Sequence, residues 1–439
     1  MKTLTARSPF GAGPVSDFTW QDGRFAPVGV SAARLERIGG LWGQFALHTR
    51  DDRADVLVRD RLGVNKLFFT VTAAGDVESS NYLADLLWRG HQLRDIWSVP
   101  AGHMVRIAPR TGEYKLVPHT VLAYDAPREA PLDALVDGIR RALTFTFERL
   151  AAALRGRRIF VNLSGGLDST VVALLAREHF DAITAVTFAM DDEQSGSDLS
   201  FARLVAEHAR IPLEVVRASP DDVVALLDTV LVYGQDWRDF NVHCGLVNAA
   251  IGRGLRARLG EDAGLQRPVL LTGDTMNELV ADYSPVVYRN IEYYTLPKVP
   301  MDRLRRVLVA GLDAGDREVG IFNAFGFDVI QPYALAADAL IAVPGAVLAA
   351  PRAKQELVRA VMGDRVPAAV YDRPKVRAQV GSTEGGGTLA VLADRGIDAI
   401  RLQQRFAELF GIDVRELQSL IRGGLYRFTP VAPWELARA

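Results

Sequence analysis

The chain has 439 residues, 49% hydrophobic and 24% charged, which is typical of a soluble globular protein with two or three domains. Its 51 Lys and Arg residues nearly balance 53 Asp and Glu residues, so nothing indicates a surface that binds nucleic acid by charge. The single cysteine, Cys244, excludes a disulfide scaffold and a cysteine-rich zinc site. Without a membrane-length apolar run or the apolar core of a secretory signal, we expect a cytoplasmic protein with no membrane partner.

The first part of the chain is predicted to be mostly β-structure. Short runs rich in β-branched and aromatic residues, divided by Asp, Arg and Gly, predict strands at 43–49, 54–60 and 66–72. Segments 98–109 and 112–119 predict a further hairpin. The stretch 123–133 carries Pro and charge with few apolar residues, which is typical of a linker. We therefore expect two domains, 1–125 and 126–439.

The second part alternates between helix-like and strand-like segments. Apolar residues spaced by three and four predict a long helix at 133–156. Strands are then expected at 158–163, 183–190, 213–218 and 268–273, and helices at 169–179, 201–210 and 221–233. Such alternation predicts parallel βαβ units and therefore an α/β domain with a doubly wound parallel sheet. Beyond residue 300 the pattern is mainly helical.

One stretch, RIFVNLSGGLDSTVVALLA (158–176), has the pattern of a phosphate-binding loop between a strand and a helix. Two glycines let the backbone turn tightly and direct its N–H groups at an anion, and the following helix adds its positive end. Asp168 is placed to hold Mg²⁺ on the phosphates, and the loop lacks the GK[ST] ending of a Walker A motif. The residues expected to bind ATP are Ser164, Gly165, Gly166, Asp168, Ser169 and Thr170.

The SGGLDS hexapeptide resembles the signature of N-type ATP pyrophosphatases, which cleave ATP to AMP and pyrophosphate. Segment 43–69 is similar to the amidotransferase-type (Ntn-type) domain of asparagine synthetases, and LTGDTMNELVADY (271–283) to their GEGxDELFGGY loop. Segments 326–345 and 354–375 resemble later parts of the same proteins in the same order. The chain is identified as a member of the asparagine synthetase class B superfamily. Arg373-Pro374-Lys375 resembles the RPK loop of the β-lactam synthetase and carbapenam synthetase branch.

Two departures from that family affect the expected chemistry. Glutamine-dependent members begin with a nucleophilic cysteine after the initiator Met, whereas this chain has Lys2. The resemblance then implies a truncated, inactive amidotransferase-like domain, and an amine that comes from the substrate itself or from a separate molecule. The second departure is Asn277, where the family has a magnesium-binding Asp. Either Asp274 or Glu278 joins Asp168 in holding Mg²⁺, or Asp168 and the phosphates hold it.

The resemblance also implies catalytic roles, for adenylation of a carboxylate followed by attack of an amine. Lys375 is expected to stabilise the oxyanion on the acyl carbon, and Arg373 to share the phosphate contacts. The tyrosine and glutamate that take the proton of the amine in β-lactam synthetases correspond to Asp274 and Glu318. Tyr283 and Asp328 are reserve candidates for this role. A solvated surface lysine and a helix-surface glutamate are the alternatives for Lys375 and Glu318.

The function expected from this resemblance is an ATP-dependent, AMP-forming amide ligase without glutaminase activity. Its partners would be a small-molecule carboxylate and an amine, and specialised metabolism such as antibiotic biosynthesis is the expected setting. Cyclisation of one substrate and coupling of two are not separable from the sequence, and a homodimer is left open. The alternatives are a tRNA-modifying ATP pyrophosphatase and a pseudoenzyme that binds nucleotide.

Overall fold

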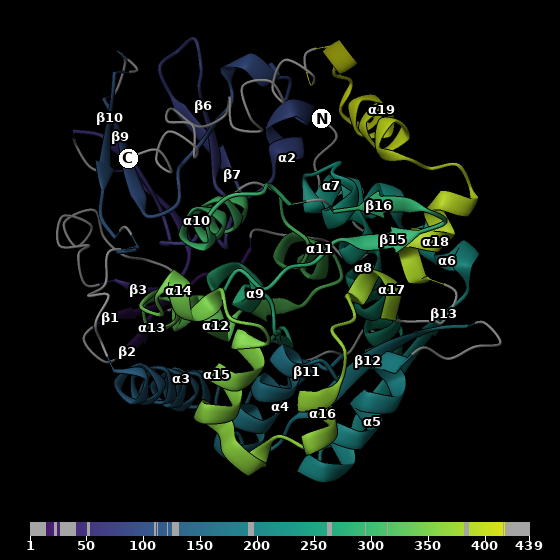
Figure 1. Cartoon of the computed structure of the whole chain (residues 1–439). Helices are drawn as coiled ribbons and strands as arrows, with labels where there is room; N and C mark the ends of the chain where they lie inside the picture. Colours follow the sequence, from purple (N-terminus) through teal and green to yellow (C-terminus); the bar gives the residue numbers. More distant parts are fainter. Residues whose placement is uncertain are drawn as a thin grey trace.

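The fold is taken from a computed structural model (Figure 1). The residues that the structure describes are 15–21, 24–26, 41–50, 53–108, 111, 113–120, 122–124, 131–191, 197–260, 266–294, 296–313, 315–381, 386–415 and 417. Lys2 and the predicted boundary at 125–126 lie outside them, so the division into two domains stays a prediction. Within the described part, no helix is both long and apolar enough to cross a membrane.

A five-stranded parallel sheet forms the centre of the chain, with strand order β13-β12-β11-β14-β17. These strands are Leu213–Ala218 (β13), Thr184–Met190 (β12), Ile159–Asn162 (β11), Val269–Leu271 (β14) and Asp328–Ile330 (β17). In register, Phe160 of β11 lies opposite Thr184 on one side and Leu270 on the other. Strand order reverses between β11 and β14, which is where open α/β sheets bind ligands at the carboxyl ends of their strands.

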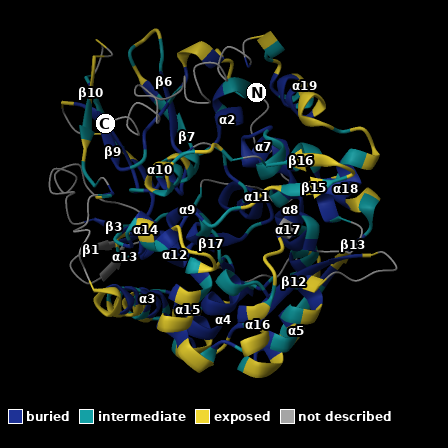
Figure 2. Cartoon of the chain, viewed as in Figure 1, coloured by how far each residue is buried: buried dark blue, intermediate teal, exposed yellow. Residues whose placement is uncertain are grey.

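Helices cover both faces of this sheet, which confirms the predicted doubly wound arrangement. In Figure 1, α3 (Leu132–Ala153), α4 (Leu167–His179) and α5 (Ser197–Ala209) lie below the strands. On the other face lie α7 (Leu227–Gly234), α8 (Asp239–Leu259) and α11 (Val319–Ala324). Both faces of the sheet are thus covered, which explains why the central strands β11, β12 and β14 are largely apolar. Figure 2 shows α4 and α8 mostly buried, while α3 and α5 expose one side.

The N-terminal part is mostly β-structure, as predicted, and consists of antiparallel sheets. One contains β1 (Phe18–Gln21), β2 (Arg24–Ala26) and β3 (Trp42–Gln44), and a second contains β4 (Ala46–Arg50), β5 (Asp55–Arg59), β9 (His103–Ile107) and β10 (Tyr114–Pro118). The third contains β6 (Phe68–Val71), β7 (Val77–Ser80) and β8 (Trp97–Ser98). Helix α2 (Leu83–Trp88) packs against β6 and β7 of this sheet. The predicted hairpin of 98–109 and 112–119 is β9 with β10. The amidotransferase-type assignment of this part stays a prediction.

The remaining helices and strands lie outside these sheets. They are α6 (Pro220–Val224), α9 (Met276–Leu279), β15 (Val286–Tyr288), β16 (Ile291–Tyr293), α10 (Met301–Gly311), α12 (Pro332–Leu335), α13 (Ala337–Ile341), α14 (Gly345–Leu348), α15 (Ala353–Met362), α16 (Ala368–Asp372), α17 (Ala378–Gly381), α18 (Gly387–Asp394) and α19 (Ala399–Phe410). The predicted helix 221–233 is two helices, because α6, capped by Ser219, ends at Ala225. The mainly helical pattern beyond 300 is confirmed, apart from β17.

A fully buried arginine joins the N-terminal part to the rest of the chain. Arg59 Nη1 lies 2.5 Å from Asp313 Oδ1, and Arg59 also donates to the carbonyl groups of Gly63 (2.6 Å), Asn65 (2.9 Å) and Val99 (2.6 Å). With all of these partners, the guanidinium group is held without contact to water. Burial of this pair is tolerable because the two charges and their hydrogen bonds compensate for lost hydration.

Replacing Arg59 with Met is expected to lower the free energy of unfolding by about 3–5 kcal/mol, because it leaves Asp313 buried without its counter-ion. Urea unfolding followed by circular dichroism measures this change. The matched control is Arg405→Met, which breaks an ion pair with Asp228 whose two side chains are nearly half exposed. That control should cost about 1 kcal/mol or less. Equal losses for the two variants would contradict the structural role of Arg59.

Candidate active site

The phosphate-binding loop connects β11 to α4 at the switch point of the sheet. Gly165 has a φ of +70°, and a Cβ there would lie 2.5 Å from the backbone of Ala202. Glycine is therefore required both for the left-handed conformation and for the close approach to α5. No side chain caps the start of α4, a helix of 13 residues, so its N-terminal dipole faces the loop. The predicted strand, glycine turn and helix are therefore present in the predicted order.

Side-chain hydroxyls fix the shape of this loop from within. Ser169 Oγ lies 3.1 Å from Ser164 Oγ and accepts a hydrogen bond from the Ser164 backbone N–H, while Thr170 donates to the Gly166 carbonyl at 2.8 Å. Thr170 is fully buried in that contact. The Thr170 hydroxyl therefore holds the turn from the buried side of the loop.

A cavity of about 220 Å³ opens beyond the carboxyl ends of β11 and β14. It brings together most of the predicted site from four segments far apart in the sequence. The predicted residues that line it are Ser164, Gly166, Asp168, Ser169, Asp274, Glu318, Arg373 and Lys375. Gly165 faces α5 and Thr170 faces the core, so neither lines this cavity, and Glu278 lines a neighbouring one.

Two lysines reach the floor of this cavity, and only one of them was predicted. Lys354, from α15, places its Nζ 2.6 Å from Asp168 Oδ1 and 2.6 Å from Asn277 Oδ1. Lys375 places its Nζ 3.0 Å from the same Asn277 oxygen and 2.7 Å from Asp282 Oδ2. The Lys375 side chain is 23% exposed although the residue as a whole lies at the surface, and its pairing with Asp282 favours a place at the cavity over that of a solvated surface cation. One neutral amide oxygen and two carboxylates thus hold two ammonium groups in the cavity.

These contacts set the charge of the two lysines. Burial opposes the charged form of Lys354, but the carboxylates of Asp168 and Asp282 outweigh it and raise the pKa of Lys354. For Lys375, burial and the neighbouring Lys354 ammonium lower the pKa to about 8. At neutral pH both groups therefore carry a positive charge, and Lys375 is the one that loses its proton first as the pH rises.

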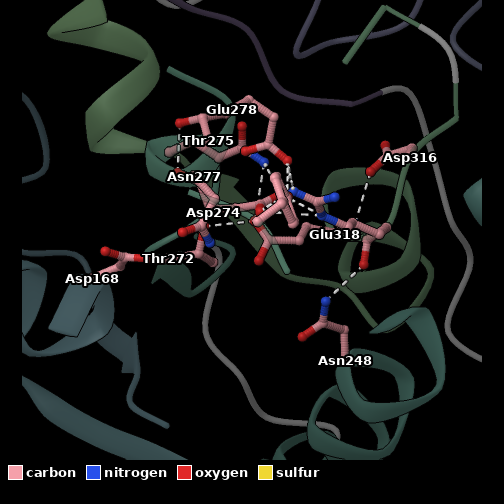
Figure 3. Close-up of polar contacts among 12 residues, drawn as sticks. Asp168, Asn248, Thr272, Asp274, Thr275, Asn277, Glu278, Asp316 and Glu318 are labelled. Atoms are coloured by element: carbon pink, nitrogen blue, oxygen red, sulfur yellow. Dashed lines mark hydrogen bonds and ion pairs between the residues drawn. The ribbon is translucent and has the colours of Figure 1, made fainter. Parts of the chain in front are cut away.

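An arginine that was not predicted holds the acidic residues of the 271–283 segment. Arg317 Nε lies 2.9 Å from Asp274 Oδ2, and its Nη2 lies 2.6 Å from Glu278 Oε1. Tyr283 donates a hydrogen bond to the same Glu278 oxygen. The Arg317 backbone is fixed in turn by Asn248 on α8, which donates to its carbonyl at 2.7 Å. Figure 3 shows Asp274, Glu278 and Glu318 gathered in one group, with Asp168 set to one side.

This arrangement does not fit the predicted Mg²⁺ ligand set of Asp168, Asp274 and Glu278. Asp168 faces the Lys354 ammonium, whereas Asp274 and Glu278 face the Arg317 guanidinium, so the three carboxylates do not converge. Among the described residues no group of three His, Cys, Asp or Glu side chains could hold a metal ion. The structure therefore gives no support to Asp274 or Glu278 as the ligand that replaces the family's Asp at Asn277, which leaves Asp168 with the phosphates as the remaining expectation, and we assign no catalytic step to a metal ion on these residues.

The predicted proton-accepting pair is brought together. Glu318 is 6% exposed, which overturns the helix-surface alternative, and its Oε2 accepts hydrogen bonds from Thr272 (2.6 Å) and Gln331 (3.0 Å). The same Gln331 amide lies 3.5 Å from Asp274 Oδ2. Burial, and then the negative charge of Asp274, raise the pKa of Glu318, and burial also raises the pKa of Asp274. Such a pair retains a proton at a pH where ordinary carboxyl groups are ionised.

The three remaining candidates are Arg373, Tyr283 and Asp328. Arg373 donates to the Ser164 carbonyl at 3.2 Å and pairs with Asp198, so it lies beside the phosphate loop as predicted. Tyr283 lies in the cavity wall through its bond to Glu278. Asp328 begins β17 at the opposite end of the sheet, 2.5 Å from Arg157, so its reserve role as a base is wrong.

Part of the chain is similar to known proteins. Residues 150–313 match the asparagine synthase family. The matched segment contains the phosphate-binding loop and the 271–283 segment. An NH₃-dependent NAD⁺ synthetase of Mesorhizobium japonicum is 33% identical over 129 residues, which cover 27% of this chain and 37% of that protein. The chain thus spans little more than a third of that relative.

Three solved structures show a weaker likeness. NMN synthetase from Francisella tularensis has a TM-score of 0.32 at 15% identity, covering 63% of this chain and 87% of that one. Glutamine-dependent NAD⁺ synthetase from Acinetobacter baumannii, in complex with ADP, scores 0.25 at 17% identity (50% and 37% covered). NH₃-dependent NAD synthetase from Campylobacter jejuni scores 0.25 at 12% identity (40% and 73% covered).

Proposed function

We propose that the protein is an ATP-dependent carbon–nitrogen ligase that adenylates a carboxylate, releases pyrophosphate and joins the acyl group to an amine. The observation that carries this proposal is the meeting of three groups in one cavity. These are the phosphate loop, the two lysines Lys354 and Lys375, and the buried Glu318–Asp274 pair. The asparagine synthase-type domain and the similarity to an NAD⁺ synthetase support ATP use of this kind.

In the first step, a carboxylate oxygen attacks the α-phosphorus of ATP and the bond to the leaving pyrophosphate breaks. The backbone of 164–166 and the N-terminal end of α4 would bind the phosphates. Arg373, Lys354 and Lys375 are cations that line the same cavity, and Asp168, Asn277 and Asp282 hold the two lysines in place. Preorganised positive charge of this kind lowers the barrier because negative charge grows on the leaving group.

In the second step, the amine nitrogen attacks the acyl carbon, AMP leaves and the amine loses a proton. The Glu318–Asp274 pair would accept that proton, since its raised pKa values make it a stronger base than a solvated carboxylate. Lys375 would stabilise the oxyanion that forms on the acyl carbon. Thr272 and Gln331 keep Glu318 oriented toward the cavity.

We further propose that no glutamine is consumed. A glutaminase of this kind needs a reactive thiolate, and the single cysteine of the chain is Cys244 on α8. Burial raises the pKa of the Cys244 thiol to about 12, so it is not a thiolate at neutral pH. This chemistry agrees with the RPK resemblance to β-lactam and carbapenam synthetases, and with a role in the synthesis of a specialised metabolite.

Trapping with hydroxylamine tests the proposed function and identifies the acid. The protein is incubated with ATP, hydroxylamine and a metabolite extract of its source, and acyl hydroxamates are sought by mass spectrometry. We expect one hydroxamate that depends on both ATP and the protein, because hydroxylamine intercepts the activated acyl group. AMP formation without any hydroxamate would refute carboxylate activation and favour the tRNA-modifying alternative.

A further inference from the structure

A second cavity, of about 290 Å³, lies between the N-terminal part and the synthetase part of the chain. Most of its surface is apolar, from Val64, Leu296, Val307, Leu308 and Leu312. It adjoins the first cavity, because several residues line both. Those shared residues are Phe240, Asp274, Tyr283, Arg317 and Arg377.

Arg377 is the unusual member of this shared wall. Its side chain is 7% exposed, yet its buried Nε and Nη1 atoms have no hydrogen-bond partner. The Nη2 atom donates to the Ser284 carbonyl. Three aromatic rings surround the guanidinium group, with Tyr283 at 4.9 Å, Tyr294 at 5.2 Å and Phe240 at 5.4 Å. Aromatic rings partly stabilise a buried cation, but they do not satisfy its N–H donors.

The other arginines of the second cavity have their counter-ions. Arg317 is paired with Asp274 and Glu278, and Arg238 with Asp236 at 2.6 Å. Among the described residues, no carboxylate forms an ion pair with Arg377. A buried charge without a counter-ion is costly, and a guanidinium group with two open donors is complementary to a carboxylate. An anion that arrives with a ligand would supply this partner.

We propose that Arg377 binds a carboxylate of a substrate and so selects a substrate in which that anionic group is joined to an apolar body. The inference rests on the proposed ligase function and names the class of substrate for the same site. The apolar lining of the second cavity would receive the body, while the reacting group enters the first cavity. Two sources would supply the carboxylate: a second carboxyl group on the acid, or the carboxyl group of an amino acid that serves as the amine.

Equilibrium binding tests this without turnover, so it does not depend on the proposed reaction. Isothermal titration is performed in the presence of α,β-methylene-ATP, an analogue that cannot release pyrophosphate. Succinate, glutarate, adipate and pimelate are each compared with the half-amide of the same length, in which one carboxylate is neutral. Glycine, β-alanine and γ-aminobutyrate are compared with their amides in the same way. The variant is Arg377→Gln, and the control is Arg238→Gln, which changes an arginine of the same cavity that already has a counter-ion.

In the wild-type protein, we expect at least one compound of the two series to bind tenfold or more tightly than the amide with which it is compared. A preference among the diacids assigns the anion to the acid, and one among the amino acids assigns it to the amine. Arg377→Gln should abolish the preference, while Arg238→Gln keeps it. The analogue should bind all three proteins within about twofold. Absence of a preference in both series of the wild type would overturn the proposal, as would a loss of nucleotide binding in place of the preference.

Discussion

Replacing Lys375 with Met is expected to slow amide formation about 100- to 1,000-fold, the usual effect of removing one group that stabilises an oxyanion. The ammonium lies 2.7 Å from Asp282 and 3.0 Å from Asn277, so it is held at the floor of the cavity without being neutralised by a single rigid partner. The measurement is a single-turnover experiment on the acid identified by hydroxamate trapping, with AMP and product quantified over time.

The pH dependence gives an independent check on Lys375. Because its pKa is lowered to about 8 and the charged form is the active one, the wild-type rate should fall as the pH rises through about 8. Lys375→Arg keeps a charge but not the compact ammonium, and should recover only part of the rate. Lys115→Met, at an exposed position on β10, is the matched control and should be unaffected. A full rate in Lys375→Met would remove Lys375 from the mechanism.

Replacing Glu318 with Gln is expected to slow the attack of the amine about 100-fold or more, the range for loss of a general base. Glutamine has nearly the same shape and still accepts hydrogen bonds from Thr272 and Gln331, so the fold around it should persist. Hydroxamate formation should change much less than amide formation, because hydroxylamine is less basic than an alkylamine and is largely unprotonated at neutral pH.

The acid side of the pH profile tests the same residue. The base must be ionised to accept a proton, and the pKa of Glu318 is raised, so the wild-type rate should increase with pH across a range above that of an ordinary carboxyl group. In Glu318→Gln this increase should be lost or displaced. Glu178→Gln, an exposed residue on α4, is the control. An unchanged rate and pH profile in Glu318→Gln would end its candidacy.

The local sequence predicted those parts of the fold and site that depend on neighbours in the chain. Two glycines between an apolar strand and a helix predict the turn at 164–166, since φ at Gly165 and the contact with α5 admit only glycine. The parallel strands were predicted because burial on both faces requires continuous apolar runs. β17 (Asp328–Ile330) was missed because it begins with an aspartate and so offers only two apolar residues, whereas the equally short β14 (Val269–Leu271) is apolar throughout.

The site residues that the sequence did not predict owe their roles to partners far away in the chain. Lys354 meets Asp168 from 186 positions away, and nothing in its own surroundings distinguishes it from a surface lysine on a helix. Arg317 lies 43 positions from Asp274, and its presence is what removes Asp274 and Glu278 from the predicted metal site. Only the packing of α15 and of the segment before α11 against the sheet reveals these partners.

The most direct test of the central claim is phosphorus NMR of the protein with Mg-ATP and a metabolite extract of its source. A parallel sample contains Asp168→Ala, in which the partner of Lys354 at the phosphate loop is removed. We predict that AMP and pyrophosphate appear together, in equal amounts, with the wild-type protein and are lost with the variant. The appearance of ADP and phosphate in their place would contradict the account.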